Sequence, residues 1–510
     1  MITTSMNEVN YSIDLDGRTT IANYNDAKPF ASFFPGVAGL DGIPLWCFTT
    51  NRGQCISSFG VQNKDGGILD FSAAIDAYQR TPLLGFRTFM KVADQVYEPF
   101  RPGRCCPNQM SFTPADLCLH EENPGLGIAV DVTMMTVPGE LFPALARRVV
   151  IRNTGAEPRA VEWVDGLSRI IPCGMKYDDV VHMHNTRTKM AVAEILDDGV
   201  ACFHYRNIEP LGDNGPCHFA LHFDESGPMP AMVDPAVVFG RDTMLDLPQT
   251  FIAGGGLNTK KQLMEGRNFT AMTAEACILQ PGESVAVTGV FGYAKHRRLV
   301  PGIAARVRQP GWFESKLERN EQIVAGLTNP CATFSADRAF DHYARASFLD
   351  NTLRGGFPLT LPDASGRKQV LYVYSRIHGD MERDYNNFEI EPGFWSQGNG
   401  GYRDIGQNQR NAIYVNPDTM ETSIRYYTNM IFLDGYNPHY LWGTVYEIED
   451  NARIDAILAE APIPSDAAEP LAEMLTGEFT PGKLLTLIAE NDIHTGAGNE
   501  ELLGRIIAAS

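Results

Sequence analysis

The stretch "ARRVVIRNTGAEPRAVEWVDGLSRII", residues 146–171, decides the fold class of this chain. Its β-branched run ends at Asn153, an Asn-Thr-Gly turn signal follows, and a second run passes through Val161, Trp163 and Val164. β-Branched and aromatic residues favour strands, and Asn and Gly favour the turns between strands. The stretch therefore predicts a strand, a turn and a second strand.

The same alternation continues from the start of the chain to Val300. Short runs rich in valine, isoleucine, phenylalanine and threonine are separated by glycine, proline and aspartate, and no long helical period interrupts them. Such a density of strand and turn signals is typical of a large antiparallel β-sandwich. We therefore expect residues 1–305 to form a sandwich domain.

The pattern becomes helical after Pro310. Residues 311–327 carry apolar side chains at helical spacing, which predicts a helical linker over residues 306–332. Residues 335–356 predict the first helix of an all-helical domain, with Ser335 as its N-cap and the final pair of glycines as its stop.

Two further segments complete the helical part. Residues 333–450 are expected to form the core of the helical domain, and residues 451–510 a helical extension or insertion. Within the extension, three short amphipathic helices are predicted, the first two opened by Ser465 and Thr480. The fold class is therefore a multi-domain β + α protein.

Composition limits the partners of the protein. The chain has 510 residues, of which 44% are hydrophobic, so two or more domains are expected. A formal net charge of −20 argues against nucleic acid as a partner, because binding to phosphates depends on lysine and arginine clusters. The sequence shows neither an apolar run long enough to span a bilayer nor a secretory leader. We expect a cytoplasmic protein without a membrane partner.

Cysteine and histidine residues give no metal signature. The ten cysteines show no Cys-x-x-Cys spacing, which is typical of reduced structural thiols. His182 and His184 are spaced to share one face of a strand, but no acidic or cysteine ligand follows at a convincing distance. We therefore expect no metal and no cofactor.

The densest chemistry of the sequence surrounds "QGNGGYRDIGQNQRN", residues 397–411. Between residues 376 and 450, tyrosine, phenylalanine and tryptophan alternate with amides and carboxylates. A pyranose ring has apolar faces edged by hydroxyl groups, so it is bound by aromatic rings with polar side chains around them. This mixture favours a sugar as ligand. The alternative is an ordinary surface loop, since glycine and amide residues are common there.

A family resemblance supports the sugar hypothesis. The segment "GGYRDIGQN" resembles the Gly-Tyr/Phe-Arg-Asp-x-x-Gln-Asp/Asn segment of inverting glycoside phosphorylases of glycoside hydrolase family 94. The longer stretches at residues 378–411 and 43–71 ("IPLWCFTTNRGQCISSFGVQNKDGGILDF") resemble the 1,2-β-oligoglucan phosphorylase branch more than cellobiose phosphorylase. The resemblance covers essentially the whole chain. It implies an N-terminal β-supersandwich, a helical linker and the first part of an (α/α)6 barrel.

The resemblance also implies a glucosyl subsite. It assigns Arg403 and Asp404 to the glucosyl unit at the nonreducing end, with Gln407 and Asn408 as supporting contacts. Asn408 replaces an aspartate of the cellobiose-type enzymes. The flanking aromatic residues Trp395 and Tyr402 are expected to contribute to the pocket wall.

Glu389 is the first local candidate for a further substrate contact. It precedes the turn that carries glycine and tryptophan, and it is one of five carboxylates that could lie near the aromatic wall. The alternative is that these carboxylates have no functional role and are solvated or paired with arginine. The other four carboxylates are Asp380, Glu382, Asp384 and Glu391.

The implied activity is phosphorolysis of β-linked gluco-oligosaccharides, including β-1,2-glucan, to α-glucose 1-phosphate with inversion. One carboxylic acid must protonate the glycosidic oxygen while inorganic phosphate attacks the anomeric carbon from the opposite face. In the family this acid lies well beyond the Arg-Asp segment, and no equivalent is found before Ser510. The catalytic acid therefore stays unassigned and is expected outside this chain.

We accordingly expect the N-terminal half of a catalytic unit, completed by a second polypeptide that carries the rest of the barrel and assembled as an oligomer. Two alternatives remain open. One is a hydrolase or transglycosylase of the same fold, and the other is a non-catalytic sugar-binding subunit.

Overall fold

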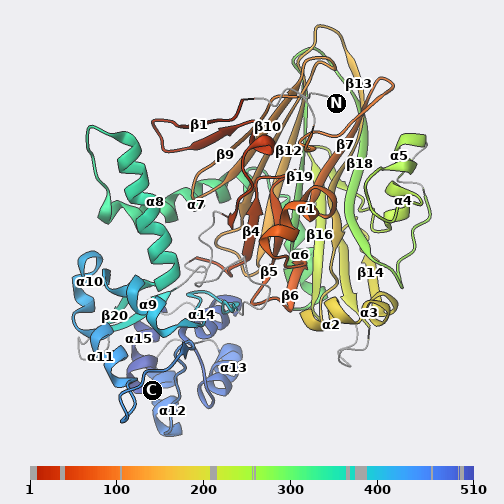
Figure 1. Ribbon diagram of the computed structural model, residues 1–510. Coiled ribbons are helices and arrows are strands. Elements are labelled where there is room, and N and C mark those ends of the chain that lie inside the picture. Colours follow the sequence, from red (N-terminus) through yellow and green to blue (C-terminus); the bar gives the residue numbers. More distant parts are fainter. Residues whose placement is uncertain are drawn as a thin grey trace.

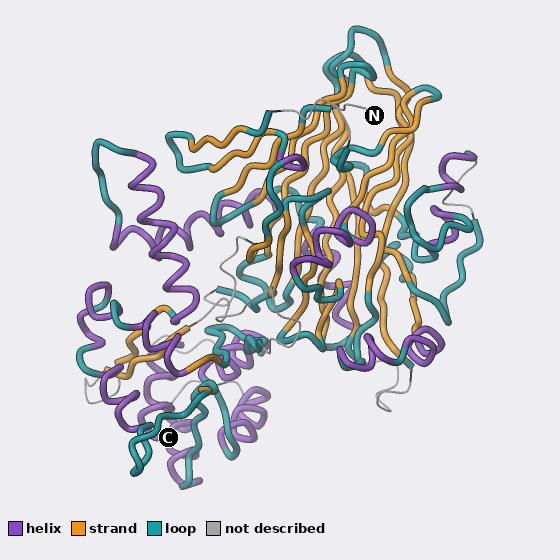
Figure 2. Tube along the Cα trace, viewed as in Figure 1, coloured by secondary structure: helices purple, strands orange, loops and turns teal. Residues whose placement is uncertain are grey.

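The computed structural model describes residues 8–34, 41–103, 106–206, 215–254, 257, 260–362, 368–373, 388–460, 463, 465–491, 493 and 499–510. It shows a β-sandwich that carries the N-terminal half and a helical unit that carries the C-terminus (Figures 1 and 2). This β + α architecture was predicted from the sequence. The first part of an (α/α)6 barrel, which the family resemblance implies, stays a prediction.

One large antiparallel sheet forms the main layer of the sandwich. Within the described residues it runs in the order β1 (Asn10–Ile13), β2 (Thr19–Ala22), β9 (Asn108–Phe112), β10 (Leu117–Asn123), β11 (Ile128–Thr136), β12 (Ala144–Asn153), β19 (Ser284–Ala294), β16 (Cys217–Asp224), β15 (Ala201–Tyr205) and β14 (Ala191–Ile195), with β17 (Gly227–Met229) paired to β16. Most residues of its long central strands β11, β12, β16 and β19 are buried, as expected for strands covered on both faces.

Two smaller sheets and five short helices pack around the large sheet. The first sheet has the order β18 (Phe269–Leu279), β13 (Arg159–Ile170), β7 (Phe86–Val92) and β8 (Gln95–Tyr97). The second has the order β3 (Ala31–Phe33), β4 (Trp46–Thr50), β5 (Ile56–Val61) and β6 (Gly66–Leu69). The helices are α1 (Ala74–Leu84), α2 (Tyr177–His182), α3 (His184–Met190), α4 (Pro235–Phe239) and α5 (Gln249–Ala253).

The two strands predicted from residues 146–171 exist, but they lie in different sheets. β12 pairs with β11 and β19, whereas β13 pairs with β18 and β7. The turn between them therefore carries the chain from one layer of the sandwich to the other. Asn153 holds this crossing, because its side-chain amide donates to the carbonyl oxygens of Glu157 and Leu279, both at 2.9 Å.

The side chains of β12 divide between two cores. Leu145, Val149 and Ile151 lie in the cluster between the sheets, while Ala144 and Ala146 face a second cluster on the opposite side of the large sheet. This alternation follows from the two-residue period of a strand.

The second cluster is closed by α6 (Val300–Val307) and α7 (Trp312–Thr328). Their apolar faces, including Ile303, Trp312 and Phe313, pack on the large sheet. The indole nitrogen of Trp312 also donates to a carboxylate oxygen of Glu140 at 3.2 Å. The predicted linker helix is thus α7, and α6 begins a few residues before the expected domain boundary.

The helix α8 (Arg338–Gly355) leads into the helical unit (Figure 1). The predicted stop is correct, because Gly356 is the C-cap. The predicted N-cap Ser335 is wrong by two residues. The carboxylate of Asp337 caps the helix instead by accepting hydrogen bonds from the amides of Ala339 and Phe340, and a carboxylate is favoured near the positive end of the helix dipole.

The helical unit contains short elements besides α8. They are β20 (Phe357–Pro362), β21 (Lys368–Val373), β22 (Gly400–Gly401), α9 (Tyr402–Gln409), α10 (Ala412–Val415), α11 (Thr422–Asn429), β23 (Tyr440–Leu441), α12 (Asn451–Glu460), α13 (Ser465–Leu475), α14 (Pro481–Glu490) and α15 (Asn499–Ala509). The three predicted C-terminal helices are α13, α14 and α15. Thr480 is the N-cap of α14, because its hydroxyl oxygen accepts the amide hydrogen of Lys483.

The structure places His182 and His184 differently from the prediction. They lie at the end of α2 and the start of α3, not on one face of a strand. Within the described residues, no group of three or more potential ligands is placed to hold a metal ion. None of the helices in that part of the chain is long and apolar enough to cross a membrane.

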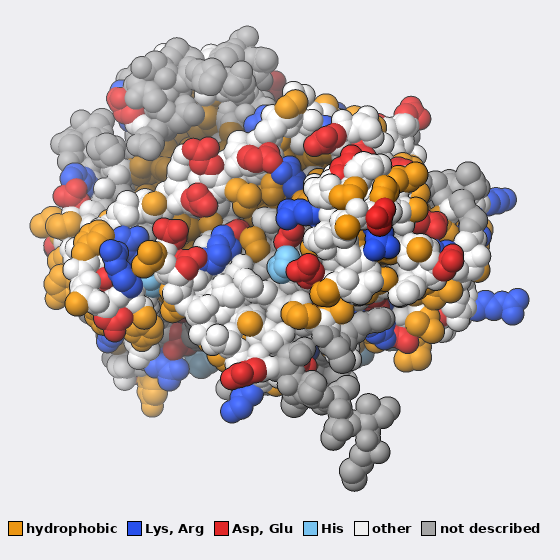
Figure 3. Space-filling model, turned by 90° about the horizontal axis from the view of Figure 1, so that it is seen from above, with side chains coloured by type: hydrophobic (Ala, Val, Ile, Leu, Met, Phe, Trp, Pro, Cys, Tyr) orange, Lys and Arg blue, Asp and Glu red, His pale blue; other side chains and the backbone are white. Residues whose placement is uncertain are grey.

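Charges are mixed over the surface seen from above. Figure 3 shows acidic and basic side chains interspersed on this face and no large area of one sign.

Candidate sugar-binding site

The segment that resembles the glucosyl subsite begins at a strand built from two glycines. Gly400 and Gly401 of β22 pair with Leu441 and Tyr440 of β23. A Cβ atom on Gly400 would lie 2.7 Å from Cδ1 of Ile405, which is closer than carbon atoms can pack. Glycine at this position therefore lets the side chain of Ile405 pack closely against the strand.

Arg403 and Asp404 lie in this first turn. Nε and Nη2 of Arg403 both donate to Oδ1 of Asp404, each at 3.0 Å. The arginine side chain is 80% exposed and the aspartate 24%. The pair therefore fixes the guanidinium plane, while the outer N–H groups remain accessible to a ligand. The negative charge of Asp404 is also favourable near the N-terminus of a helix.

Aromatic side chains lie on β23 and directly after it. Tyr440 and Trp442 form an edge-to-face pair with ring centroids 5.8 Å apart, and Trp442 is among the most exposed large apolar residues. An exposed indole ring can pack on the apolar face of a sugar ring.

Glu389 reaches this region from the loop before β22. Its amide donates to the side-chain oxygen of Asn399 at 3.1 Å, and its Oε1 accepts a hydrogen bond from Nε2 of Gln62 at 3.0 Å. Burial raises the pKa of Tyr440, and the charge of Glu389 raises it further. The structure thus gathers Glu389, Tyr440 and the first turn of α9 around the paired strands β22 and β23.

The other predicted contacts take different places. The hydroxyl of Tyr402 donates to the backbone carbonyl of Tyr427 at 2.9 Å, so this ring holds α9 against α11. Trp395 packs against the apolar cluster of the C-terminal helices. Gln407 is exposed on α9. Their roles as sugar contacts stay predictions.

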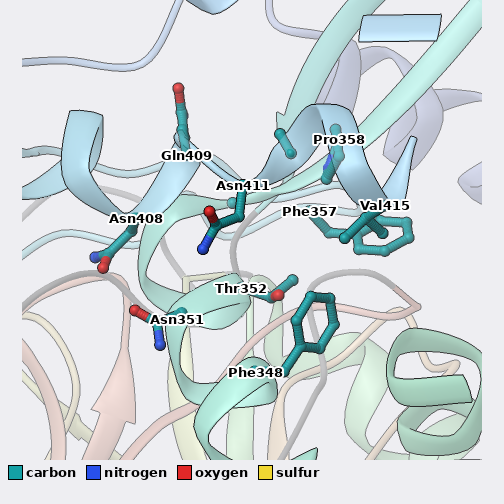
Figure 4. A pocket seen from close by; sticks show the side chains of 11 residues that line it. Phe348, Asn351, Thr352, Phe357, Pro358, Asn408, Gln409, Asn411 and Val415 are labelled. Carbon is teal, nitrogen blue, oxygen red and sulfur yellow. The ribbon is translucent and has the colours of Figure 1, made fainter. Parts of the chain in front are cut away.

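Asn408 lines a small pocket (Figure 4). The pocket lies between α8, α9, α10 and β20 and has a volume of about 60 Å³. Asn408 comes from the last turn of α9, together with Gln409, while Phe348 and Thr352 come from α8. A space of this size holds water molecules and no pyranose ring. The pocket alone therefore cannot be the sugar site.

Glu391 is buried against α14. The hydroxyl of Thr480 donates to its Oε1, and its Oε2 has no hydrogen-bond partner among the described residues. Burial raises the pKa of Glu391 above its ordinary value. A raised pKa is typical of a general acid, but in this structure one carboxylate oxygen is bound by Thr480 and the other is enclosed by protein atoms. The remaining local candidates Asp380, Glu382 and Asp384 lie outside the described residues.

Sequence reasoning missed Gln62 and Asn399 as supports of Glu389. Gln62 follows β5 in the sandwich, and its backbone carbonyl also accepts the amide of Ile390 at 2.8 Å. No local pattern marks this contact, because it joins residues more than three hundred positions apart. The second segment of the family resemblance, residues 43–71, contains Gln62 and was the only available signal.

The chain was compared with known proteins. No protein-family model matches it, and no curated protein matches it. Among solved structures, a polysaccharide lyase aligns over 50% of this chain and 33% of its own, with 11% identity and a TM-score of 0.28.

Two other solved structures are carbohydrate-related. A bacterial glucoamylase in complex with acarbose aligns over 87% of this chain and 60% of its own, with 9% identity and a TM-score of 0.39. A protein described as a kojibiose phosphorylase from the human microbiome aligns over 66% of this chain and 32% of its own, with 5% identity and a TM-score of 0.23. The chain thus spans 32–60% of the lengths of these three proteins. At these identities and TM-scores the likenesses decide neither fold nor activity.

Proposed function

We propose that this chain is a subunit, or the N-terminal half, of a carbohydrate-active enzyme of glycoside hydrolase family 94. The proposed reaction is the phosphorolysis of β-linked gluco-oligosaccharides, including β-1,2-glucan, to α-glucose 1-phosphate with inversion. The observation that carries the proposal is the Arg403–Asp404 pair at the start of α9, directly after a glycine-only strand that pairs with the strand of Tyr440.

Each group has a role in this proposal. Arg403 and Asp404 hold hydroxyl groups of the glucosyl unit, because charged partners form strong and directional hydrogen bonds. Trp442 or Tyr440 offers an apolar face to the ring. Glu389 contributes a further polar contact near the paired strands β22 and β23.

The bond-breaking step needs groups that this chain does not provide in the described residues. Phosphate attacks the anomeric carbon, the bond to the glycosidic oxygen breaks, and a carboxylic acid gives its proton to that oxygen. Glu391 is half-buried, with Oε1 bound by the hydroxyl of Thr480, and the proposal gives it no catalytic role. We therefore assign the acid to a second polypeptide that carries the rest of the barrel.

An exposed apolar surface supports the second polypeptide. The segment from α10 to residue 445 exposes many large apolar side chains, and few of its described residues are buried. An apolar surface of this density on a water-soluble unit is typical of an interface. The exposed residues are Ile413, Tyr414, Met420, Ile424, Ile431, Phe432, Leu433, Tyr436, Trp442 and Val445.

Calorimetry with β-1,2-linked gluco-oligosaccharides tests the sugar site. We expect Arg403→Ala to weaken binding by roughly 10- to 100-fold, because a hydrogen bond to a charged group contributes about 1.5–3 kcal/mol. Arg425→Ala is the matched control, since Arg425 is also exposed on a short helix and paired with a neighbouring carboxylate, that of Glu421. Equal binding by both variants and the unsubstituted protein would refute the site.

Release of glucose 1-phosphate separates the possible reactions. The protein with its partner polypeptide should release it only when inorganic phosphate is supplied. Release of free glucose without phosphate would identify a hydrolase. Binding of oligosaccharide without turnover, even with the partner, would identify a sugar-binding subunit.

A further inference from the structure

Three arginine side chains converge on one carboxylate in the sandwich. Asp70 follows β6, and its Oδ2 lies 3.1 Å from Nη2 of Arg169, 3.9 Å from Nη2 of Arg80 and 4.0 Å from Nη1 of Arg187. The arginines come from β13, α1 and α3 respectively. The fold thus brings three separate elements together around a single oxygen atom.

The charges of this cluster do not balance. Among the described residues, Asp70 is the only carboxylate that forms an ion pair with any of the three arginines. Three guanidinium groups and one carboxylate leave two positive charges in excess. Buried charges are normally paired, because their transfer from water is unfavourable.

Two of the three arginine–Asp70 contacts also have long nitrogen–oxygen distances. At 3.9 and 4.0 Å, Arg80 and Arg187 are beyond hydrogen-bonding distance from the carboxylate. Arg80 donates to the hydroxyl of Ser72 at 2.9 Å, and Arg187 donates to the carbonyl of Val180 at 3.0 Å. Each therefore keeps further N–H groups for another acceptor.

A buried polar atom in the same cluster lacks a partner. Nε of Arg169 is buried and makes no hydrogen bond with the described residues. It can donate a hydrogen bond, so it requires an acceptor. Burial lowers the pKa of Arg169, and the neighbouring Arg187 and Arg80 lower it further against the effect of Asp70. A bound anion would relieve each of these conditions.

We propose that this cluster binds a phosphate group, either inorganic phosphate or the phosphate of a small ester. A phosphate group carries a charge close to −2 at neutral pH and several acceptor oxygens, which matches the two excess charges and the free donors. Access is from the side of Arg80, whose side chain is 39% exposed, whereas that of Arg187 is only 4% exposed. The site uses no residue of the candidate sugar site.

Calorimetric titration with inorganic phosphate, against chloride at equal ionic strength, tests this proposal. Arg80→Gln removes the most exposed arginine without opening the core and should weaken phosphate binding at least tenfold. Arg152→Gln is the matched control, because Arg152 is 51% exposed and lies 3.8 Å from its partner Asp131. This variant should bind phosphate as the unsubstituted protein does.

Two results would overturn the proposal. One is the absence of any phosphate binding beyond the effect of chloride. The other is equal weakening in the Arg80 and Arg152 variants, which would show a general effect of surface charge. Far-ultraviolet circular dichroism confirms that the variants are folded.

Further titrations separate the ligands and the sites. Tighter binding of glucose 1-phosphate than of inorganic phosphate would assign the site to a phosphate ester, and the reverse would assign it to the free ion. Phosphate binding at the cluster should persist in Arg403→Ala, because that residue belongs to the sugar site. Loss of phosphate binding in Arg403→Ala alone would place the anion at the sugar site and overturn the proposal.

Discussion

Thr480 donates its hydroxyl hydrogen to Oε1 of Glu391 and thereby ties the N-terminus of α14 to the loop that leads into the candidate sugar site. The same loop is held at a second point, where the amide of Phe394 donates to the hydroxyl of Thr486 at 3.1 Å. The C-terminal helices thus position the site segment, although they contribute none of its predicted contacts.

We expect Glu391→Gln to stabilise the protein at neutral pH. Burial raises the pKa of Glu391 above 4.5, so its favourable contribution is present below pH 4.5 and is lost as the pH rises through the folded-state pKa. Glutamine keeps the acceptor for Thr480 and carries no charge. Its advantage in melting temperature should therefore grow with rising pH and vanish below pH 4.5.

Glu473→Gln is the control for this measurement, because Glu473 is exposed on α13. A lower melting temperature of Glu391→Gln at pH 7 would show that the ionised carboxylate makes a favourable contact there, contrary to our expectation.

A glycine on α14 should be as important for the loop as Glu391. A Cβ atom on Gly482 would lie 2.1 Å from the carbonyl oxygen of Phe394, so Gly482→Ala must displace the loop or the helix. We expect a loss of about 1–3 kcal/mol in the free energy of unfolding, as for other overpacked sites. Oligosaccharide binding should weaken as well, since the loop carries Glu389 into the site.

Gly477→Ala provides the comparison in chemical denaturation, because a Cβ atom on Gly477 would meet no atom within 4 Å. If both alanine variants unfold at the same denaturant concentration, the close packing of α14 on the loop has no energetic importance.

The sequence predicted the kinds of element better than their partners. The strands ending at Asn153 and passing through Trp163 are present, because the local preference of β-branched residues coincides with burial. Their assignment to separate sheets could not be predicted, since it depends on pairing with strands far along the chain. The turn signal of residues 153–155 is the same for a hairpin and for a crossing between layers.

For the candidate site, too, the sequence predicted the residues better than their contacts. The resemblance marked Arg403 and Asp404, and the structure pairs them at an exposed helix start. It could not show that Trp395 and Tyr402 are used for packing, because an aromatic residue has the same sequence signature in a core and on a sugar platform.

A buried ion pair joins the two layers of the sandwich and predicts a large effect on stability. Nη2 of Arg147 on β12 donates to Oδ1 of Asp165 on β13 at 2.9 Å, and both side chains are almost completely buried. Arg147→Met leaves the aspartate unpaired, which is expected to reduce the free energy of unfolding by about 3–5 kcal/mol.

The double variant Arg147→Met with Asp165→Leu should lose less than the sum of the single losses, because no unpaired charge remains. Urea unfolding of the four proteins in this cycle measures the coupling energy. Additive losses would mean that the two side chains do not stabilise each other.

Two histidines in the core of β16 should make the sandwich sensitive to acid. Burial lowers the pKa of His218 and of His222 from 6.5 to about 4. A lowered folded-state pKa means that the neutral form stabilises the fold above pH 6.5 and that this contribution is lost as the pH falls towards 4. Each fully buried histidine then accounts for about 3 kcal/mol of stability over this range.

His222→Phe should therefore remove part of the stability loss between pH 6.5 and pH 4. Phenylalanine keeps an aromatic ring against Phe291, on which the imidazole packs edge-to-face with ring centroids 5.4 Å apart. His120→Asn is the opposite control: the hydrogen bond to Asp131 raises the pKa of His120, so its contribution is lost as the pH rises. A melting temperature of His222→Phe that falls with acid as steeply as that of the unsubstituted protein would show that His222 is not the acid-sensitive group.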